Sequence, residues 1–135
     1  MLVEWSESFV VGHSLIDREH RDLVDLVNET QRTMADQSDT QAVSDSLLAI
    51  LVRTEEHFEH EEQIMRDFSY PFVHKHRTAH QELVRLTTTM IRDAEGQEAL
   101  LRALNLTASA LADHMRGYDG LFCTYLKDNG CFGVI

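Results

Sequence analysis

Apolar residues recur every three or four positions along most of the chain, which is the period of an amphipathic helix. In the first such stretch one apolar stripe consists of Ile16, Leu23, Val27 and Met34. The pattern predicts four helices, over residues 17–36, 40–67, 72–94 and 98–126. No stretch alternates apolar and polar residues as a half-buried strand does, so the sequence predicts an all-α fold.

Short polar breaks separate the expected helices. Ser14 or Asp17 is placed to cap the first helix, and a turn-like segment at residues 36–39 follows it. Pro71 rules out a continuous helix through its position, and residues 127–130 end the fourth helix. Four long helices with short connections predict an antiparallel up-down-up-down four-helix bundle, a fold whose core commonly holds metals.

Length and charge limit the possible partners. A chain of 135 residues is expected to form a single domain, with an N-terminal arm at residues 1–13, the bundle at 14–128 and a C-terminal tail at 129–135. The net charge of −11 argues against binding to nucleic acid and to anionic membrane surfaces, where basic patches supply the attraction. Length and charge do not indicate what the protein does bind.

Targeting signals and cysteines indicate the expected location. The longest apolar run, residues 47–52, is far shorter than a membrane span, and the first residues carry acids where a secretory signal would carry bases. We therefore expect a cytoplasmic protein. Cys123 and Cys131 fit this expectation as free thiols, because a disulfide framework has a denser pattern of cysteines.

Helix phase divides the eight histidines into two sets. Five fall on apolar stripes and are expected to point into the bundle: His20, His57, His76, His80 and His114. Glu61 shares the inward face of His57, because residues four apart lie on one side of a helix. His60 and His74 group with charged residues, and His13 precedes the first helix, so we expect these three not to point inward.

The inward histidines and two acids, Glu61 and Asp119, predict a metal centre. A lone inward histidine is usually a satisfied core residue, but this many unpaired polar groups would cost several kcal/mol each in a dry core. Lys and Arg are absent from the inward stripes and cannot pair with them. Seven N and O ligands are too many for one zinc or magnesium ion, which favours two metals sharing carboxylate bridges. Imidazole with carboxylate suits iron, manganese, cobalt or zinc, so the ligands alone leave the metal open.

The spacing of His114 and Asp119 conflicts with a regular helix. Five residues rotate by about 140°, so both side chains cannot point straight at one centre. Either Asp119 reaches round, or the turn loosens into an i→i+5 bulge eased by Gly117 and Gly120.

The chain resembles the hemerythrins, and specifically the bacterial form called bacteriohemerythrin, over nearly its full length. The matching pieces are Trp5, Gly12, residues 16–20, residues 57–65, Tyr70-Pro71, His76, His80 and residues 114–119. The resemblance implies a non-haem di-iron centre that binds O2, with two iron ions and a bridging oxo or hydroxo group. It implies that the ligands of one iron are His76, His80 and His114, those of the other are His20 and His57, and the bridges are Glu61 and Asp119.

One position departs from the family pattern. Hemerythrins usually carry Trp-Leu just before the last histidine, whereas this chain has Ala110-Leu111. The resemblance places Leu111, Ala110 and Met115 around the O2 pocket. Loss of the aromatic side chain predicts easier access for water or small anions and faster autoxidation, unless Met115 or Phe122 fills the space.

Three classes of function follow from the resemblance. The first is an O2-binding or redox-sensing domain, including the input domain of a larger signalling protein; the second is a freestanding O2 storage or delivery protein; the third is a di-metal oxidase or peroxidase. Carboxylate-rich di-iron sites carry four carboxylates, and the smaller number here favours reversible binding over catalysis. We therefore expect the domain itself not to be an enzyme, although a fused signalling enzyme stays open. The more open pocket expected at Ala110 favours a sensor over a storage protein. Its expected partners are O2 and a fused or partner signalling domain.

Overall fold

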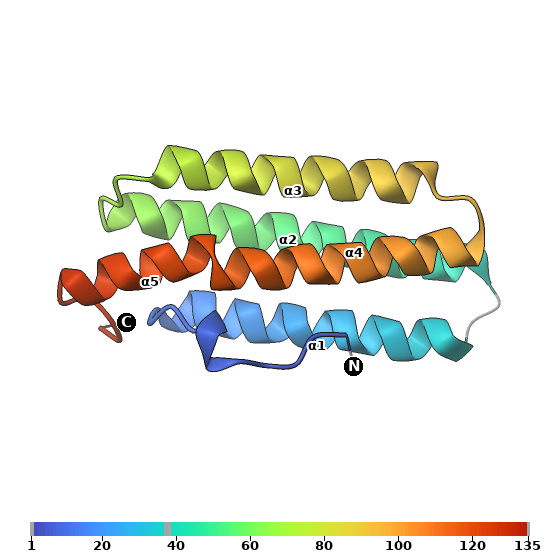
Figure 1. The fold of residues 1–135 in the computed structure, drawn as a ribbon, viewed down its shortest axis with the longest axis horizontal. Helices are drawn as coiled ribbons and strands as arrows, with labels where there is room; N and C mark the ends of the chain where they lie inside the picture. Colours follow the sequence, from blue (N-terminus) through green and yellow to red (C-terminus); the bar gives the residue numbers. More distant parts are fainter. Residues whose placement is uncertain (1, 37–38, 135) are drawn as a thin grey trace.

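All regular structure is helical in the part of the chain that the computed structural model describes, residues 2–36 and 39–134. The helices are the 3-10 helix Glu7–Phe9, α1 (Ser14–Asp36), α2 (Thr40–Asp67), α3 (Val73–Asp93), α4 (Gly96–Arg116) and α5 (Tyr118–Asp128). α1 to α4 run alternately up and down, and α5 continues the direction of α4 (Figure 1). The predicted all-α four-helix bundle is therefore confirmed. Residues 37 and 38 of the predicted turn lie outside the described part of the chain.

The prediction of one continuous helix over residues 98–126 is wrong. The rod breaks at Gly117, whose ψ of −80° lies far from the α-helical value of about −42°. The amide of Gly117 still donates to the carbonyl of Asp113 at 2.8 Å, and the amide of Leu121 donates to Gly117 at 3.1 Å. The distortion is thus an interruption between two helices, and the i→i+5 bulge, one of the two possibilities that the spacing left open, is not seen. Asp119 lies in the first turn after this break.

The core consists of two apolar clusters that lie at different levels of the bundle. The larger one includes Val24, Phe58 and Leu83, and the smaller one includes Ile16 and Phe122. Along every rod, the seven predicted ligands fall at the transition from one cluster to the other. A polar layer therefore crosses the bundle between two apolar layers.

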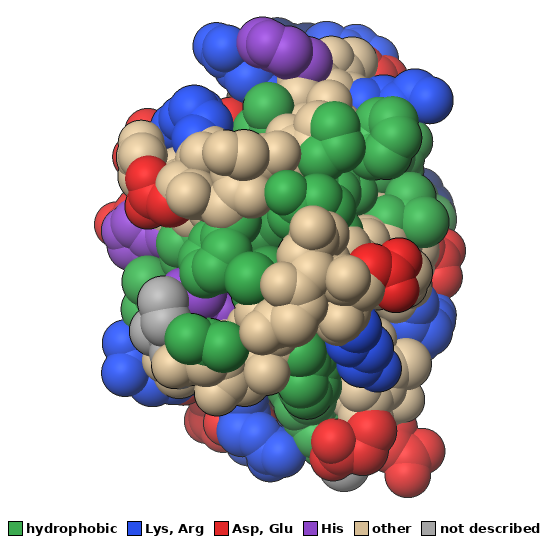
Figure 2. All heavy atoms as spheres, turned by 90° about the vertical axis from the view of Figure 1, so that its left-hand side faces the viewer, with side chains coloured by type: hydrophobic (Ala, Val, Ile, Leu, Met, Phe, Trp, Pro, Cys, Tyr) green, Lys and Arg blue, Asp and Glu red, His purple; other side chains and the backbone are tan. Residues whose placement is uncertain are grey.

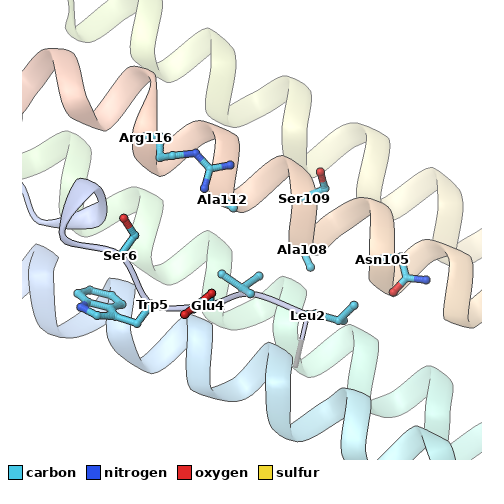
Figure 3. A pocket seen from close by; sticks show the side chains of 10 residues that line it. Leu2, Glu4, Trp5, Ser6, Asn105, Ala108, Ser109, Ala112 and Arg116 are labelled. Carbon is cyan, nitrogen blue, oxygen red and sulfur yellow. The ribbon is translucent and has the colours of Figure 1, made fainter.

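The N-terminal arm packs along the bundle beside α1 and α4 (Figure 1). Asn28 holds the arm by accepting from the amides of Leu2 and Val3 and by donating to the carbonyl of Val3 at 2.8 Å. Phe9 is fully buried and meets the ring of Trp5 edge-on, which anchors the arm to the bundle. The arm and α4 enclose a surface groove of about 510 Å³, which is lined by no predicted metal ligand (Figure 3).

The described part of the tail folds back onto the start of the bundle. The Phe132 ring lies where a side chain at residue 12 would be, so only Gly12 leaves room for it. The amide of Gly133 donates to the carbonyl of Gly12 at 2.7 Å. Cys123 and Cys131 are free thiols, as predicted.

One end of the bundle is rich in exposed apolar side chains. The α2–α3 turn, α5 and the tail meet there, and hydrophobic side chains gather on this face (Figure 2). The exposed large apolar residues of these segments are Phe72, Tyr118, Leu121, Phe132 and Val134. Among the helices of the described residues, none combines the length and the apolar character needed to cross a bilayer.

Candidate metal centre

All seven predicted ligands are buried and lie together in the polar layer. None is more than 6 % exposed. Their ligand atoms form two groups, each within 4.8 Å: Glu61, His76, His80, His114 and Asp119 in one, and His20, His57, Glu61 and Asp119 in the other. The two groups share Glu61 and Asp119, so the two carboxylates lie where bridging ligands would lie.

Glu61 presents a different oxygen to each group. Its Oε1 lies 2.7 Å from Nε2 of His76 and 3.1 Å from Nε2 of His80. Its Oε2 lies 3.1 Å from Nε2 of His57 and 3.4 Å from Nε2 of His20. The carboxylate thus spans the boundary between the groups, as its place on the inward face of α2 requires.

Asp119 repeats this arrangement from α5. Its Oδ1 lies 2.8 Å from Nε2 of His76 and 3.2 Å from Nε2 of His114, while its Oδ2 lies 2.9 Å from Nε2 of His20. The interruption at Gly117 turns Asp119 toward the centre. His114 and Asp119 can therefore both face the centre, although five residues separate them.

Several of these atoms are close together without forming hydrogen bonds. Nε2 of His20 and His57, Oε2 of Glu61 and both oxygens of Asp119 have no hydrogen-bond partner. Their short separations are contacts between atoms that face a shared space, because their geometry is not that of donor and acceptor. Buried polar atoms are normally paired, and a bound cation would satisfy all of them at once. The residues present therefore fit a metal centre.

The outer nitrogens of three histidines are held by acceptors. Nδ1 of His20 donates to the carbonyl of Phe9 at 2.7 Å. Nδ1 of His57 donates to Glu19 at 2.9 Å, and Nδ1 of His80 donates to Glu62 at 2.9 Å. An imidazole that donates from Nδ1 presents the lone pair of Nε2 to the centre, as metal-binding histidines do.

The electrostatics of the layer favour positive charge. Burial lowers the pKa of His20 and of His114, but Asp119 and Glu61 more than offset burial and raise each pKa to about 10. Burial raises the pKa of Asp119 and of Glu61, but the surrounding histidines prevail and hold both below their usual range. Without a metal, protons supply the positive charge that a metal cation would otherwise bring.

Two aromatic rings cover some of the predicted ligands. The ring of Phe58 stacks on His80, with centroids 3.7 Å apart and planes 6° apart. Tyr118 is 43 % exposed, stacks on His114 at 5.5 Å and meets His76 edge-on at 5.8 Å. Tyr118 therefore separates the histidines from solvent on one side.

The expectation for His13 was wrong. This residue is only 7 % exposed, meets the ring of Phe68 edge-on at 6.0 Å and leaves its Nδ1 without a partner. Burial lowers its pKa. His13 precedes α1, so helix phase could not predict its direction. The expectations for His60 and His74, which are exposed, are confirmed.

The three residues expected around an O2 pocket lie on two sides of α4. Leu111 and Met115 are buried in the larger apolar cluster. Ala110 is exposed and lines a cavity of about 610 Å³ between α3 and α4, together with Leu86 and His114. The cavity is open at Ala110 and reaches a histidine of the polar layer.

A helical bundle with a buried layer of five histidines and two carboxylates defines a cation-binding protein of the metal-containing bundle class. Residues 11–126 match the family model described as "Hemerythrin HHE cation binding domain". The chain therefore belongs to the hemerythrin family, and the resemblance seen in the sequence is confirmed.

Individual relatives cover most of the chain. It is 30 % identical over 131 residues to a bacteriohemerythrin of Ralstonia nicotianae, covering 96 % of this chain and 92 % of that protein. It is 24 % identical to a bacteriohemerythrin of Stenotrophomonas maltophilia, over 93 % of this chain and 82 % of the relative. It is 27 % identical to a myohemerythrin of Theromyzon tessulatum, over 86 % and 87 %.

Proposed function

We propose that this chain binds O2 at a non-haem di-iron centre and acts as an O2- or redox-sensing domain. The observation that carries the proposal is that two ligand groups share Glu61 and Asp119. In the proposed centre His76, His80 and His114 would hold one iron, and His20 and His57 would hold the other. Glu61 and Asp119 would be shared by both irons, together with an oxo or hydroxo group.

The ligand set supports binding rather than catalysis. Two ferrous ions would carry four positive charges, and two carboxylates with one hydroxide would offset three of them. The centre would therefore stay cationic, which favours the ferrous state. When bound, the two ferrous ions supply the electrons and the open coordination position that reversible O2 binding requires. The group of His20 and His57 has one histidine fewer than the other, which leaves room for that position.

Two features of the fold support sensing over storage. The cavity at Ala110 gives small molecules a route to the ring of His114, so oxidation of the centre by its surroundings is expected to be fast. Asp119 lies in the first turn of α5, so a change at this bridging carboxylate acts directly on α5. The exposed apolar end that includes α5 (Figure 2) is the surface on which we propose that a fused or partner signalling domain packs.

Anaerobic reduction of the iron-loaded protein, followed by exposure to air, tests the proposal. We expect two irons per chain and a new visible charge-transfer band that decays to a ferric spectrum, as a redox sensor requires. A band that reverses through many cycles of deoxygenation would instead assign storage or delivery. Steady consumption of peroxide or an organic substrate would assign an oxidase or peroxidase, and a protein without iron would contradict the proposal.

A further inference from the structure

We propose that Glu19 and His60 form a latch that holds the ligand His57 in place and thereby controls how fast iron leaves the centre. The inference rests on the proposed function, because it takes His57 to be an iron ligand. Glu19 lies on α1, whereas His57 and His60 lie one turn apart on α2. The latch therefore joins two helices beside the polar layer.

The two oxygens of Glu19 have different partners. Oε1 accepts from Nδ1 of His57 at 2.9 Å, and Oε2 accepts from Nδ1 of His60 at 2.6 Å. The carboxylate is thus held at both oxygens by side chains one turn apart on α2, which fixes its rotation. His60 is 50 % exposed and Glu19 is 19 % exposed, while His57 is buried. A continuous set of hydrogen bonds therefore runs from solvent to a buried ligand.

The Nδ1 atoms of His20 and His80 donate to acceptors other than Glu19. His20 donates to the backbone carbonyl of Phe9, which has no side-chain rotation to restrain. His80 donates to Glu62, whose other oxygen lies 3.9 Å from the guanidinium of Arg77, too far for a hydrogen bond. Glu19 is therefore the support whose orientation depends on a second hydrogen bond, and His60 supplies that bond.

Solvent reaches the latch from the surface. A hollow of about 40 Å³ is lined by Glu19, His57, Asp22, Leu23, Arg53 and Glu56. This volume exceeds the roughly 10–15 Å³ that one water molecule requires. A carboxylate at this edge turns toward water when its second hydrogen bond is lost, and His57 then loses the acceptor that orients its ring. The same hollow offers iron a short way out once His57 swings aside.

The test is the rate at which iron passes from the anaerobic Fe²⁺-loaded protein to the chelator ferrozine. Loss of the outer partner of a metal-binding histidine typically weakens metal binding about 10- to 100-fold. We expect Glu19→Ala to accelerate release within this range and His60→Ala to accelerate it about 10-fold, near the lower end of the range. His60→Asn places an amide N–H where Nδ1 lies and should restore a slow rate. His74→Ala, at an exposed histidine of α3, is the matched control and should release iron like the wild type.

The reduction potential of the centre provides a second readout that loss of stability alone would not move. Less electron donation from a loosened His57 should raise the potential in Glu19→Ala, and in His60→Ala by a smaller amount. Wild-type release and potential in His60→Ala, or no recovery in His60→Asn, would overturn the latch while leaving the metal centre intact. A wild-type protein that holds no iron would overturn the proposed function, and the latch with it. Far-UV circular dichroism of the metal-free variants checks that each is folded.

Discussion

At the scale of single residues, Asp119 and Glu61 link the two groups of histidines. Each carboxylate directs one oxygen to one group of histidines and the other oxygen to the second group. The distances from these oxygens to the Nε2 atoms of the histidines are 2.7–3.4 Å. A neutral replacement of the same shape would keep the packing and remove the negative charge. The effect of charge can therefore be separated from the effect of packing.

Asp119→Asn should lower the iron content from two ions per chain to one or none. The amide nitrogen cannot bind iron, so the bridge is lost while the volume of the side chain is unchanged. Iron counted after loading and desalting measures the effect. Asp113→Asn, at an exposed residue of α4, is the control and should retain two irons. Equal iron content in both variants would refute a bridging role.

Ala110→Trp should slow autoxidation several-fold. The indole would fill part of the cavity of about 610 Å³ that reaches His114 and would restrict the entry of water and small anions. The rate at which the absorbance of the oxygenated protein decays in air measures the effect. Val52→Trp adds the same ring at an exposed position of α2 and should leave the rate unchanged. An unchanged rate in Ala110→Trp would show that the cavity is no route to the centre.

At the scale of elements, the break between α4 and α5 decides whether Asp119 reaches the centre. Helix phase treats residues 98–126 as one rod, so it predicts that His114 and Asp119 point in different directions. The glycine at 117 permits the break: a Cβ there would lie 3.0 Å from the carbonyl oxygen of Asp113. The carbonyl would have to shift, and the orientation of α5 with it.

Gly117→Ala should destabilise the protein by about 1 kcal/mol, because the carbonyl shift outweighs the gain in helix propensity. It should also lower the iron affinity by displacing Asp119. Gly120→Ala is the matched control, since Gly120 is helical and a Cβ there meets nothing within 4 Å. That variant should be neutral or stabilised by up to about 1 kcal/mol. Urea unfolding and iron titration of both variants check the prediction, and identical behaviour would count against it.

The same scale shows which contacts the sequence could reveal. Helix period predicts the helices, apart from the break at Gly117, and the five inward histidines, because both depend on the chain within one helix. Glu19 and Glu62 escaped prediction as partners of His57 and His80, because each contact joins two helices whose rotation the sequence does not fix. His13 escaped because its burial depends on how the arm folds. The ligand assignment and the pocket at Ala110, Leu111 and Met115 stay predictions.

At the scale of the whole molecule, the polar layer makes stability depend on pH. In the metal-free protein, the raised pKa of His20 and His114 adds stability that is complete below about 6.5 and disappears as the pH rises toward 10. The lowered pKa of Asp119 and Glu61 adds stability that is complete above the usual values of 3.8 and 4.5 and is lost as the pH falls below them.

The metal-free protein should therefore be most stable between about pH 4.5 and 6.5. Its unfolding free energy, from urea titrations at successive pH values, should decrease between pH 7 and 10. The metal-loaded protein should lack this decrease, because the cation replaces the protons. For the same reason, acid should weaken metal binding. A metal-free stability that rises from pH 7 to 10 would contradict the assigned pKa directions.

The contact between the tail and Gly12 links the two ends of the described chain. Asp119 begins α5, the segment after α5 returns to Gly12, and the arm before Gly12 presents the carbonyl of Phe9 that holds His20. His20 in turn faces Asp119 across 2.9 Å. The tail is therefore connected to the proposed ligands Asp119 and His20 by two routes, through α5 and through the arm. We therefore expect that separating the tail from Gly12 would disturb both proposed ligands at once.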